Sequence, residues 1–249
     1  KKSAAFAYLA KVRLYQAYEQ DDNYTVTQIN PVTLQKSIDA ANQVIGNYTL
    51  ESDFGYNFLP GTHENGSEAV FSIQYSDNDG TLFGRLNYGD VLSLPQGLGC
   101  CDFHKPSQNL VNAFKTNAQG LPMFDTYNDE DLDYKQLNNY KVDPRIYNTV
   151  AMPGLPWKYE KDKIYQESWV RSPGTYGYYA SLKENVPVGC GCTVNIDPFY
   201  GNSKNRIIIR YSDVLLMKAE ALIELGRVNE ALPLINQGRE RAANSTVLT

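Results

Sequence analysis

Five of the seven aromatic residues between positions 157 and 179 are the side chains in this sequence best suited to bind a ligand. They lie among Gly, Ser and Pro residues in a stretch, 157–200, that has no sustained helical or strand period. Such stretches usually form surface loops, where an aromatic ring can stack on a sugar while polar neighbours bond its hydroxyls. Packing in the core is the alternative, because Trp is highly buried on average. The predicted ligand-binding residues are Trp157, Trp169, Tyr176, Tyr178 and Tyr179.

Catalytic motifs are missing from the sequence. The two histidines, His63 and His104, do not have the spacing of a zinc enzyme, and neither a Gly-x-Ser-x-Gly elbow nor a Walker loop occurs. Gly97-Leu98-Gly99 lacks the third glycine of a dinucleotide site. A glycosidase needs only two carboxylates, which the 28 acidic residues supply in too many combinations to test. We therefore predict no catalytic residues and no cofactor.

Two acidic clusters provide oxygen atoms that could bind calcium. Asp77 and Asp79 form the first, and the second comprises Asp129, Glu130, Asp131 and Asp133. Neither has the spacing of an EF-hand with its terminal Glu, and acidic runs of this kind are ordinarily solvated loops. No metal site is predicted.

The four cysteines occur as two close pairs, Cys100-Cys101 and Cys190-Gly191-Cys192, whose spacing does not fit a zinc module. In an exported protein, bridges between the two pairs would connect distant loops and constrain the unfolded chain. We expect at least one of Cys100 and Cys101 to lie within disulfide reach of Cys190 or Cys192. Free, buried thiols are the alternative.

Composition restricts the class of protein. A chain of 249 residues with 42% hydrophobic residues can bury a substantial core. A net charge of -5, without clustered Lys and Arg, argues against binding to nucleic acid. No apolar run approaches the roughly 18 residues of a membrane span.

The most regular segment, 210–243, is predicted to form two amphipathic helices in a hairpin. Apolar residues on the first helix recur at spacings of three and four: Val214, Leu215, Ala219, Leu222 and Leu225. Gly226 is expected to end this helix, Asn229 to cap the second, and Pro233 to lie in its first turn. The alternation of small and large residues approximates a tetratricopeptide repeat, although an ordinary helical hairpin fits equally well.

A second hairpin is predicted at 3–46, with one helix from about Ser3 to Tyr18 and another from Pro31 to Gly46. Two hairpins so far apart cannot be neighbouring units of a simple solenoid unless the chain between them loops out. The region 47–209 is therefore expected to be a loop-rich insertion, with a short strand near 70–75 and a short helix after Pro106.

Several phrases resemble the SusD/RagB family, the surface glycan-binding lipoproteins of Bacteroidetes. The runs RYSDVLLMKAEALIELG and NEALPLINQGRERA resemble the family's C-terminal repeat, and Val44, Ile45, Tyr48 and Leu50 resemble the end of its preceding repeat. Further matches follow in the family's order: Glu68 before VFSIQY, PSQNLVNAF before GLP, and Asp143-Pro144-Arg145 before Pro153-Gly154. Together these phrases extend over almost the whole chain.

The resemblance implies a mostly α, SusD-like fold in which 1–249 is one partial domain and 47–209 carries the ligand-binding region. It implies surface binding of an oligosaccharide without catalysis, and import through a SusC-like TonB-dependent outer-membrane transporter. It also implies that the sequence is a fragment without the N-terminal signal region and the extreme C-terminus, anchored to the outer membrane by a lipid outside it. No binding residue carries over position by position.

The alternatives are a peptide-binding, RagB-like partner of a similar transporter, an intracellular repeat adaptor and a surface glycosidase.

Overall fold

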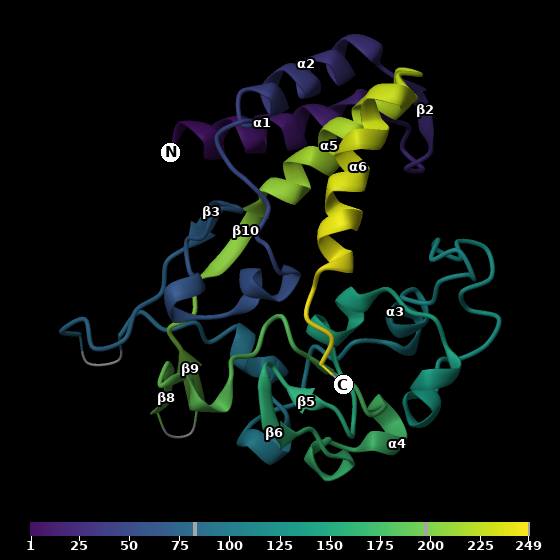
Figure 1. The fold of residues 1–249 in the computed structure, drawn as a ribbon. Helices are drawn as coiled ribbons and strands as arrows, with labels where there is room; N and C mark the ends of the chain where they lie inside the picture. Colours follow the sequence, from purple (N-terminus) through teal and green to yellow (C-terminus); the bar gives the residue numbers. More distant parts are fainter. Residues whose placement is uncertain (82–83, 197–198, 249) are drawn as a thin grey trace. The chain divides into compact units, whose positions relative to one another are not determined.

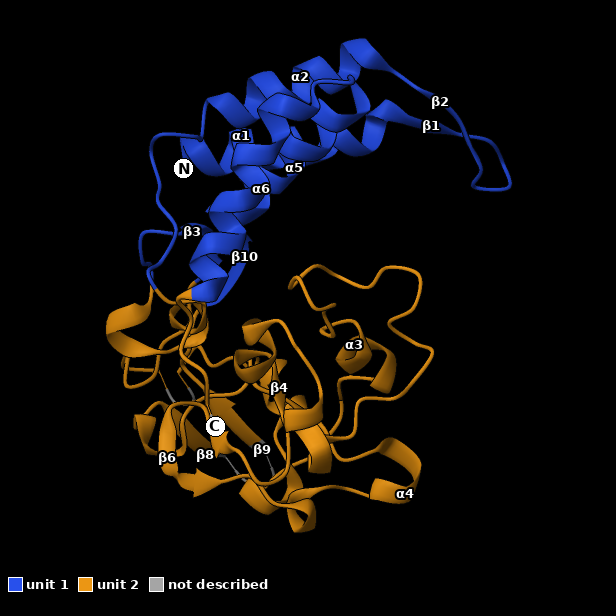
Figure 2. Ribbon diagram, turned by 45° about the vertical axis from the view of Figure 1, so that its right-hand side comes forward, with its two compact units in different colours: residues 1–52, 65–73, 206–243 blue, residues 53–64, 74–205, 244–249 orange. Residues whose placement is uncertain are grey.

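The computed structural model describes residues 1–81, 84–196 and 199–248, and its contacts divide the chain into two compact units (Figures 1 and 2). Unit 1 comprises Lys1–Ser52, Asn65–Ile73 and Arg206–Ala243. Unit 2 comprises Asp53–Glu64, Gln74–Asn205 and Asn244–Thr249. Both predicted hairpins lie in unit 1, and most of the predicted insertion forms unit 2.

Unit 1 contains the four long helices of the described chain and two pairs of antiparallel strands. The helices α1 and α2 form one hairpin and α5 and α6 the other, and α2 also packs against α5. Strand β1 pairs with β2 and strand β3 pairs with β10. The elements are α1 (Lys2–Ala17), β1 (Tyr18–Gln20), β2 (Val26–Ile29), α2 (Pro31–Asn42), β3 (Ala69–Ile73), β10 (Arg206–Arg210), α5 (Tyr211–Glu224) and α6 (Val228–Ala243).

Local signals explain where these helices begin and end. The Asn30 side chain accepts a hydrogen bond from the amide of Thr33 at 3.1 Å, and Pro31 occupies the first helical position of α2. Gly46 and Gly226 follow α2 and α5 with φ values of +95° and +73°, which glycine adopts without steric cost. The structure thus has two helices within each predicted hairpin segment, and a strand at Ala69–Ile73.

The start of α6 differs from the prediction. The helix begins at Val228, so Asn229 lies inside it and does not cap it. Pro233 lies inside the helix rather than in its first turn. Because proline has no amide hydrogen, the carbonyl of Asn229 lacks its usual helical donor at this point.

A buried ion pair connects distant segments of unit 1. The carboxylate of Glu68, which is fully buried, lies 2.5 Å from Nη1 of Arg241 and 3.9 Å from Nη1 of Arg210. The backbone amide of Glu51 also donates to this carboxylate at 3.0 Å, and the amide of Tyr211 donates to the Glu68 carbonyl at 2.8 Å. Glu68 therefore joins the start of β3 to both C-terminal helices.

Unit 2 consists of short elements joined by loops. Its strands form two-stranded antiparallel pairs, β4 with β7, β5 with β6 and β8 with β9. Its α-helices and strands are α3 (Gln108–Asn112), β4 (Val150–Ala151), β5 (Pro156–Trp157), β6 (Glu160–Ile164), α4 (Pro173–Tyr176), β7 (Ala180–Ser181), β8 (Thr193–Ile196) and β9 (Phe199–Asn202). Its 3-10 helices are η1 (Phe54–Phe58), η2 (Gly61–His63), η3 (Asp90–Ser93), η4 (Gln96–Leu98), η5 (Tyr134–Asn139), η6 (Pro144–Asn148), η7 (Glu167–Trp169) and η8 (Val188–Cys190).

A buried lysine holds several loops of unit 2 together. Nζ of Lys158 donates to the carbonyl oxygens of Phe58 at 2.7 Å and of Leu182 at 2.6 Å. Burial lowers the pKa of this amine well below its ordinary value. Lys158 and Tyr159 form the turn between β5 and β6, with φ values of +37° and +65°. These contacts fix the turn and direct the preceding residue, Trp157, into the interior.

The cysteines pair within each cluster, as Cys100–Cys101 and Cys190–Cys192. The predicted bridge between the clusters is therefore wrong. Each sulfur is bonded to a partner one or two residues away, so that none remains to connect the two loops.

We expect no thiol to react with Ellman's reagent before reduction of the unfolded chain, because all four cysteines are paired. Proteolysis without reductant, followed by mass spectrometry, is expected to yield each bridge within a single peptide. A peptide from 100–101 attached to one from 190–192 would contradict the pairing.

Among the residues that the structure describes, no helix is both long enough and apolar enough to cross a membrane.

Candidate functional site

The five predicted ligand-binding residues occupy three kinds of environment in unit 2. Trp157 and Tyr179 are buried, with 0% and 5% of their surface exposed. Trp169 and Tyr178 are partly buried, and Tyr176 is exposed. Only the last three can therefore present a ring to a ligand in this structure.

Trp157 is a core residue. Its ring lies 5.9 Å from that of Tyr165 and 6.5 Å from that of Trp169, between centroids. Its indole Nε1 donates to the carbonyl of Val186 at 3.0 Å, so its polar group is also satisfied inside the protein. The ligand-binding role predicted for Trp157 does not fit this burial, because neither face of the ring is accessible.

Tyr179 belongs to a neighbouring core cluster. Its hydroxyl donates to the carbonyl of Leu132 at 3.1 Å, and the cluster also contains Val111, Ile146 and Met152. Its predicted role likewise does not fit its position.

A group of four side chains, which we call the tyrosine cluster, lies beside these cores: Tyr134, Lys135, Glu167 and Tyr178. The ring centroids of Tyr134 and Tyr178 are 5.7 Å apart. The carboxylate of Glu167 accepts from the Tyr134 hydroxyl at 2.7 Å and lies 3.1 Å from Nζ of Lys135. This ammonium also lies 5.5 Å from the Tyr134 ring and 6.0 Å from the Tyr178 ring. Two aromatic rings and a charged pair thus share one partly exposed location.

The predicted residues Trp169 and Tyr176 are connected to this cluster through the chain. Glu167 and Trp169 belong to the same 3-10 helix, η7. Nζ of Lys163 lies 5.3 Å from the Trp169 ring centroid, which is a cation–π geometry. Tyr176 ends α4 and precedes Tyr178 by two residues, and 55% of its surface is exposed.

The titratable side chains of Tyr134, Lys135 and Glu167 in the tyrosine cluster each keep one protonation state at neutral pH. Burial, followed by the hydrogen bond to Glu167, raises the pKa of Tyr134 to about 12, so its hydroxyl stays protonated. The bonds from Tyr134 and Lys135 lower the pKa of Glu167, and the bond to Glu167 raises the pKa of Lys135. The cluster therefore offers a fixed carboxylate and a fixed ammonium beside the rings.

A second exposed aromatic residue with an organised partner is Phe103, 46% of whose surface is exposed. The Arg171 guanidinium lies 4.8 Å from its ring centroid. The backbone amide of Arg171 donates to the buried carboxylate of Asp102 at 2.7 Å, and Lys105 pairs with the same carboxylate at 2.7 Å. The position of Arg171 over the ring is thus held from the protein interior.

The sequence did not single out Tyr134, Lys135, Glu167 or the pair Phe103 and Arg171. Tyr134 directly follows an acidic run that indicates a solvated loop, and Phe103 follows two cysteines. Their partners are 32 to 68 residues away along the chain, since Lys135 pairs with Glu167 and Phe103 with Arg171. Only the tertiary fold brings them together.

The acidic clusters form internal contacts. The Asp79 carboxylate accepts hydrogen bonds from the hydroxyls of Thr81 and Ser76, and these bonds, that of Thr81 foremost, lower its pKa to about 2. The Asp131 carboxylate accepts from the side-chain Nδ2 of Asn112 at 2.9 Å. Within 1–81, 84–196 and 199–248, no group of three or more His, Cys, Asp or Glu residues is arranged to hold a metal ion.

The chain thus comprises one unit of paired helical hairpins and one loop-rich unit with partly exposed aromatic residues. A sequence model of the SusD family matches residues 67–248. The chain belongs to the SusD family, which confirms the resemblance and the mostly α, SusD-like fold.

Individual relatives are longer than this chain. SusD-like protein P38 of Formosa agariphila is 24% identical over 245 residues, which are 96% of this chain and 42% of that protein. A solved SusD-like carbohydrate-binding protein of Bacteroides fragilis is 20% identical with a TM-score of 0.68, covering 99% of this chain and 45% of the other. A structure solved with a xylogluco-oligosaccharide is 19% identical with a TM-score of 0.64, covering 97% and 44%. The chain thus spans less than half the length of these relatives.

Proposed function

We propose that this chain binds an oligosaccharide without transforming it, and that the tyrosine cluster with Trp169 and Tyr176 forms the binding surface. The observation that carries the proposal is the pair of rings, Tyr134 and Tyr178, held 5.7 Å apart beside the Glu167 and Lys135 charges. A sugar presents apolar ring faces to aromatic side chains and hydroxyls to charged ones, so this combination matches its chemistry.

Membership of the SusD family supports the proposal, as do a fold neighbour described as carbohydrate binding and another solved with a xylogluco-oligosaccharide. By the same membership, we propose that the longer protein lies at the outer-membrane surface on a lipid anchor and delivers its ligand to a SusC-like TonB-dependent transporter. Co-purification of the longer protein with such a transporter from its native membrane would test this part separately.

Isothermal titration of the chain against a panel of neutral oligosaccharides and a peptide mixture tests the proposed ligand class. We expect heat of binding from at least one of the neutral oligosaccharides. Binding of peptides alone would favour a peptide-capturing role, and release of reducing sugar during the titration would favour a glycosidase. Either result would contradict the proposal.

Replacing Tyr178 by Ala is expected to weaken oligosaccharide binding about tenfold or more, because aromatic stacking contributes roughly 1 to 3 kcal/mol per ring in comparable sites. Titration with the best ligand of the panel provides the measurement. Tyr24→Ala is the matched control, since Tyr24 is 86% exposed and belongs to unit 1. Equal affinities of the two folded variants would show that the tyrosine cluster is not the site.

A further inference from the structure

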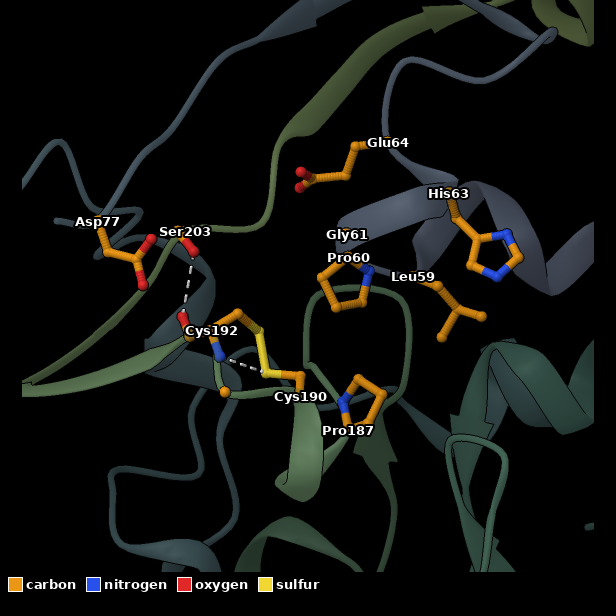
Figure 3. A pocket seen from close by; sticks show the side chains of 11 residues that line it. Leu59, Pro60, Gly61, His63, Glu64, Asp77, Pro187, Cys190, Cys192 and Ser203 are labelled. Atoms are coloured by element: carbon orange, nitrogen blue, oxygen red, sulfur yellow. Dashed lines mark hydrogen bonds between the residues drawn. A yellow bond between two sulfur atoms is a disulfide. The ribbon is translucent and has the colours of Figure 1, made fainter. Parts of the chain in front are cut away.

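A cavity of about 380 Å³ lies in unit 2 beside the Cys190–Cys192 disulfide (Figure 3). The disulfide and two prolines, Pro60 and Pro187, supply apolar wall, and the carboxylates of Glu64 and Asp77 supply charge. Its volume falls within the roughly 300 to 1,000 Å³ of small-molecule pockets. The tyrosine cluster contributes no residue to this cavity.

The Glu64 carboxylate is held in place from one side. Its Oε1 accepts a hydrogen bond from the backbone amide of Asn205 at 2.5 Å. The side chain of Asn205 in turn accepts from the amide of Tyr75 at 2.7 Å and donates to Gln74 at 2.9 Å. The amide of Glu64 also donates to the carbonyl of Gly61 at 3.0 Å. A carboxylate anchored through one oxygen can offer the other to a ligand without reorganisation.

The Asp77 carboxylate faces the same space. In Figure 3 it and the Glu64 carboxylate point toward one another across the cavity. Within the part of the chain that the structure describes, Asp77 has neither a hydrogen bond nor an ion pair through its side chain, whereas its neighbour Asp79 bonds Ser76 and Thr81. Asp79 therefore stabilises the turn that contains both aspartates, while the Asp77 side chain lines the cavity.

The lining of the cavity, as far as the structure describes it, provides no lysine or arginine to balance these two charges. The ring of His63 stacks on Tyr56 at 4.4 Å and points away from Glu64 in Figure 3. A ligand with a positive charge would gain Coulomb attraction from both carboxylates.

We propose that this cavity binds a protonated primary amine whose carbon skeleton contacts the prolines and the disulfide. An ammonium has three donors and no acceptor, which matches two carboxylates that can only accept. The amine can belong to an amino sugar within a glycan or to a lysine side chain of a peptide. The inference does not depend on the tyrosine cluster, so the two sites can be tested independently.

Isothermal titration at about pH 6, where simple amines are charged, compares matched ligands. The ligands are a glucosamine oligomer, its fully N-acetylated counterpart of equal length, a lysine peptide and the same peptide with acetylated lysine. We expect the free-amine form to bind at least about tenfold more tightly than its acetylated form in one of the two pairs, or in both. Preference in the sugar pair alone identifies an amino sugar, and preference in the peptide pair alone identifies lysine. Equal affinity within both pairs, or no binding at all, would overturn the proposal. This comparison uses the unchanged chain, so it does not depend on whether any variant folds.

Substitutions at Glu64 and Asp77 test whether the amine binds in this cavity. Glu64→Gln keeps the oxygen that accepts from Asn205, and Asp77→Asn keeps the shape of the side chain. Each is expected to weaken the free-amine ligand about tenfold, with little change for the acetylated one. Asp125→Asn, at an exposed aspartate that does not line the cavity, removes the same charge and is expected to have no such effect. A loss of the same size in this control would show that binding depends on the overall negative charge, and would overturn the proposal. Tyr178→Ala, in the tyrosine cluster, is expected to leave amine binding unchanged.

Discussion

Replacing Arg241 by Met is expected to lower the free energy of unfolding by about 3 to 5 kcal/mol, because it removes an ion-pair partner of the buried Glu68 carboxylate. The Glu68 carboxylate is fully buried and lies 2.5 Å from Nη1 of Arg241. Arg210 remains 3.9 Å away, but it also pairs with Asp213 at 3.1 Å. Its partial compensation places the expected cost near the lower end of that range.

Urea denaturation followed by far-UV circular dichroism measures this loss, since the long helices of the described chain belong to unit 1. Arg239→Met provides a matched control on the same helix, where the side chain is exposed, and is expected to change stability by no more than about 0.5 kcal/mol. The double variant Glu68→Gln/Arg241→Met removes both charges and keeps an acceptor for the Glu51 amide. It is expected to be more stable than Arg241→Met alone.

A cost for Arg241→Met no larger than that for Arg239→Met would show that the pair contributes nothing to folding. A double variant less stable than the single one would show that the cost does not arise from a buried, unpaired charge.

This ion pair gives a physical reason for sequence phrases that carried the family resemblance. Glu68 stands before the strand run VFSIQY, and Arg210 begins the run RYSDVLLMKAEALIELG. In the structure the amide of Arg210 donates to Asp213 at 2.8 Å at the start of α5. The phrases were recognisable from the sequence because each stands at the start of a helix or strand. Their connection through Glu68 also involves Arg241 of α6, far away in the sequence, and could not be predicted.

Helices α1, α2 and α5 were predictable because their signals are local. Apolar spacing, the Asn30 cap, Pro31 and the glycines at 46 and 226 all act within a few residues. The start of α6 was missed because Asn229 is a good cap by type, whereas the helix already begins at Val228. The pairing of β1 with β2 was also missed, since Tyr18 to Ile29 has neither the alternation nor the composition of a typical hairpin.

The candidate site was predicted only in part, and the reason lies in the turn between β5 and β6. Lys158 and Tyr159 adopt positive φ values there, although such turns favour Asn and Gly. The turn is held by the hydrogen bonds of Lys158 to Phe58 and Leu182, which are far away in sequence. Sequence composition therefore indicated a surface loop, while the structure directs Trp157 inward. The surface partners Tyr134 and Glu167 depend in the same way on tertiary contacts.

Replacing Trp157 by Ala is expected to cost about 3 to 5 kcal/mol of stability, since it leaves a large cavity in the core around Tyr165. The substitution also removes the donor to the Val186 carbonyl, which lies 3.0 Å from the indole nitrogen. Trp157→Phe keeps most of the apolar volume but loses this hydrogen bond, and its cost is expected to be smaller. Urea unfolding followed by tryptophan fluorescence provides the measurement, because Trp169 also lies in unit 2 and remains in both variants.

Tyr176→Ala is expected to behave in the opposite way to Trp157→Ala, with weaker binding but unchanged stability. Tyr176 is 55% exposed, so its removal is expected to change stability by no more than about 0.5 kcal/mol while weakening oligosaccharide binding. Folded Trp157→Phe is expected to bind the oligosaccharide as the unchanged chain does, because its ring is 0% exposed. If Trp157→Phe kept full stability but bound the oligosaccharide more weakly, Trp157 would belong to the ligand-binding surface. If Trp157→Ala were as stable as the unchanged chain, Trp157 would not be a core residue.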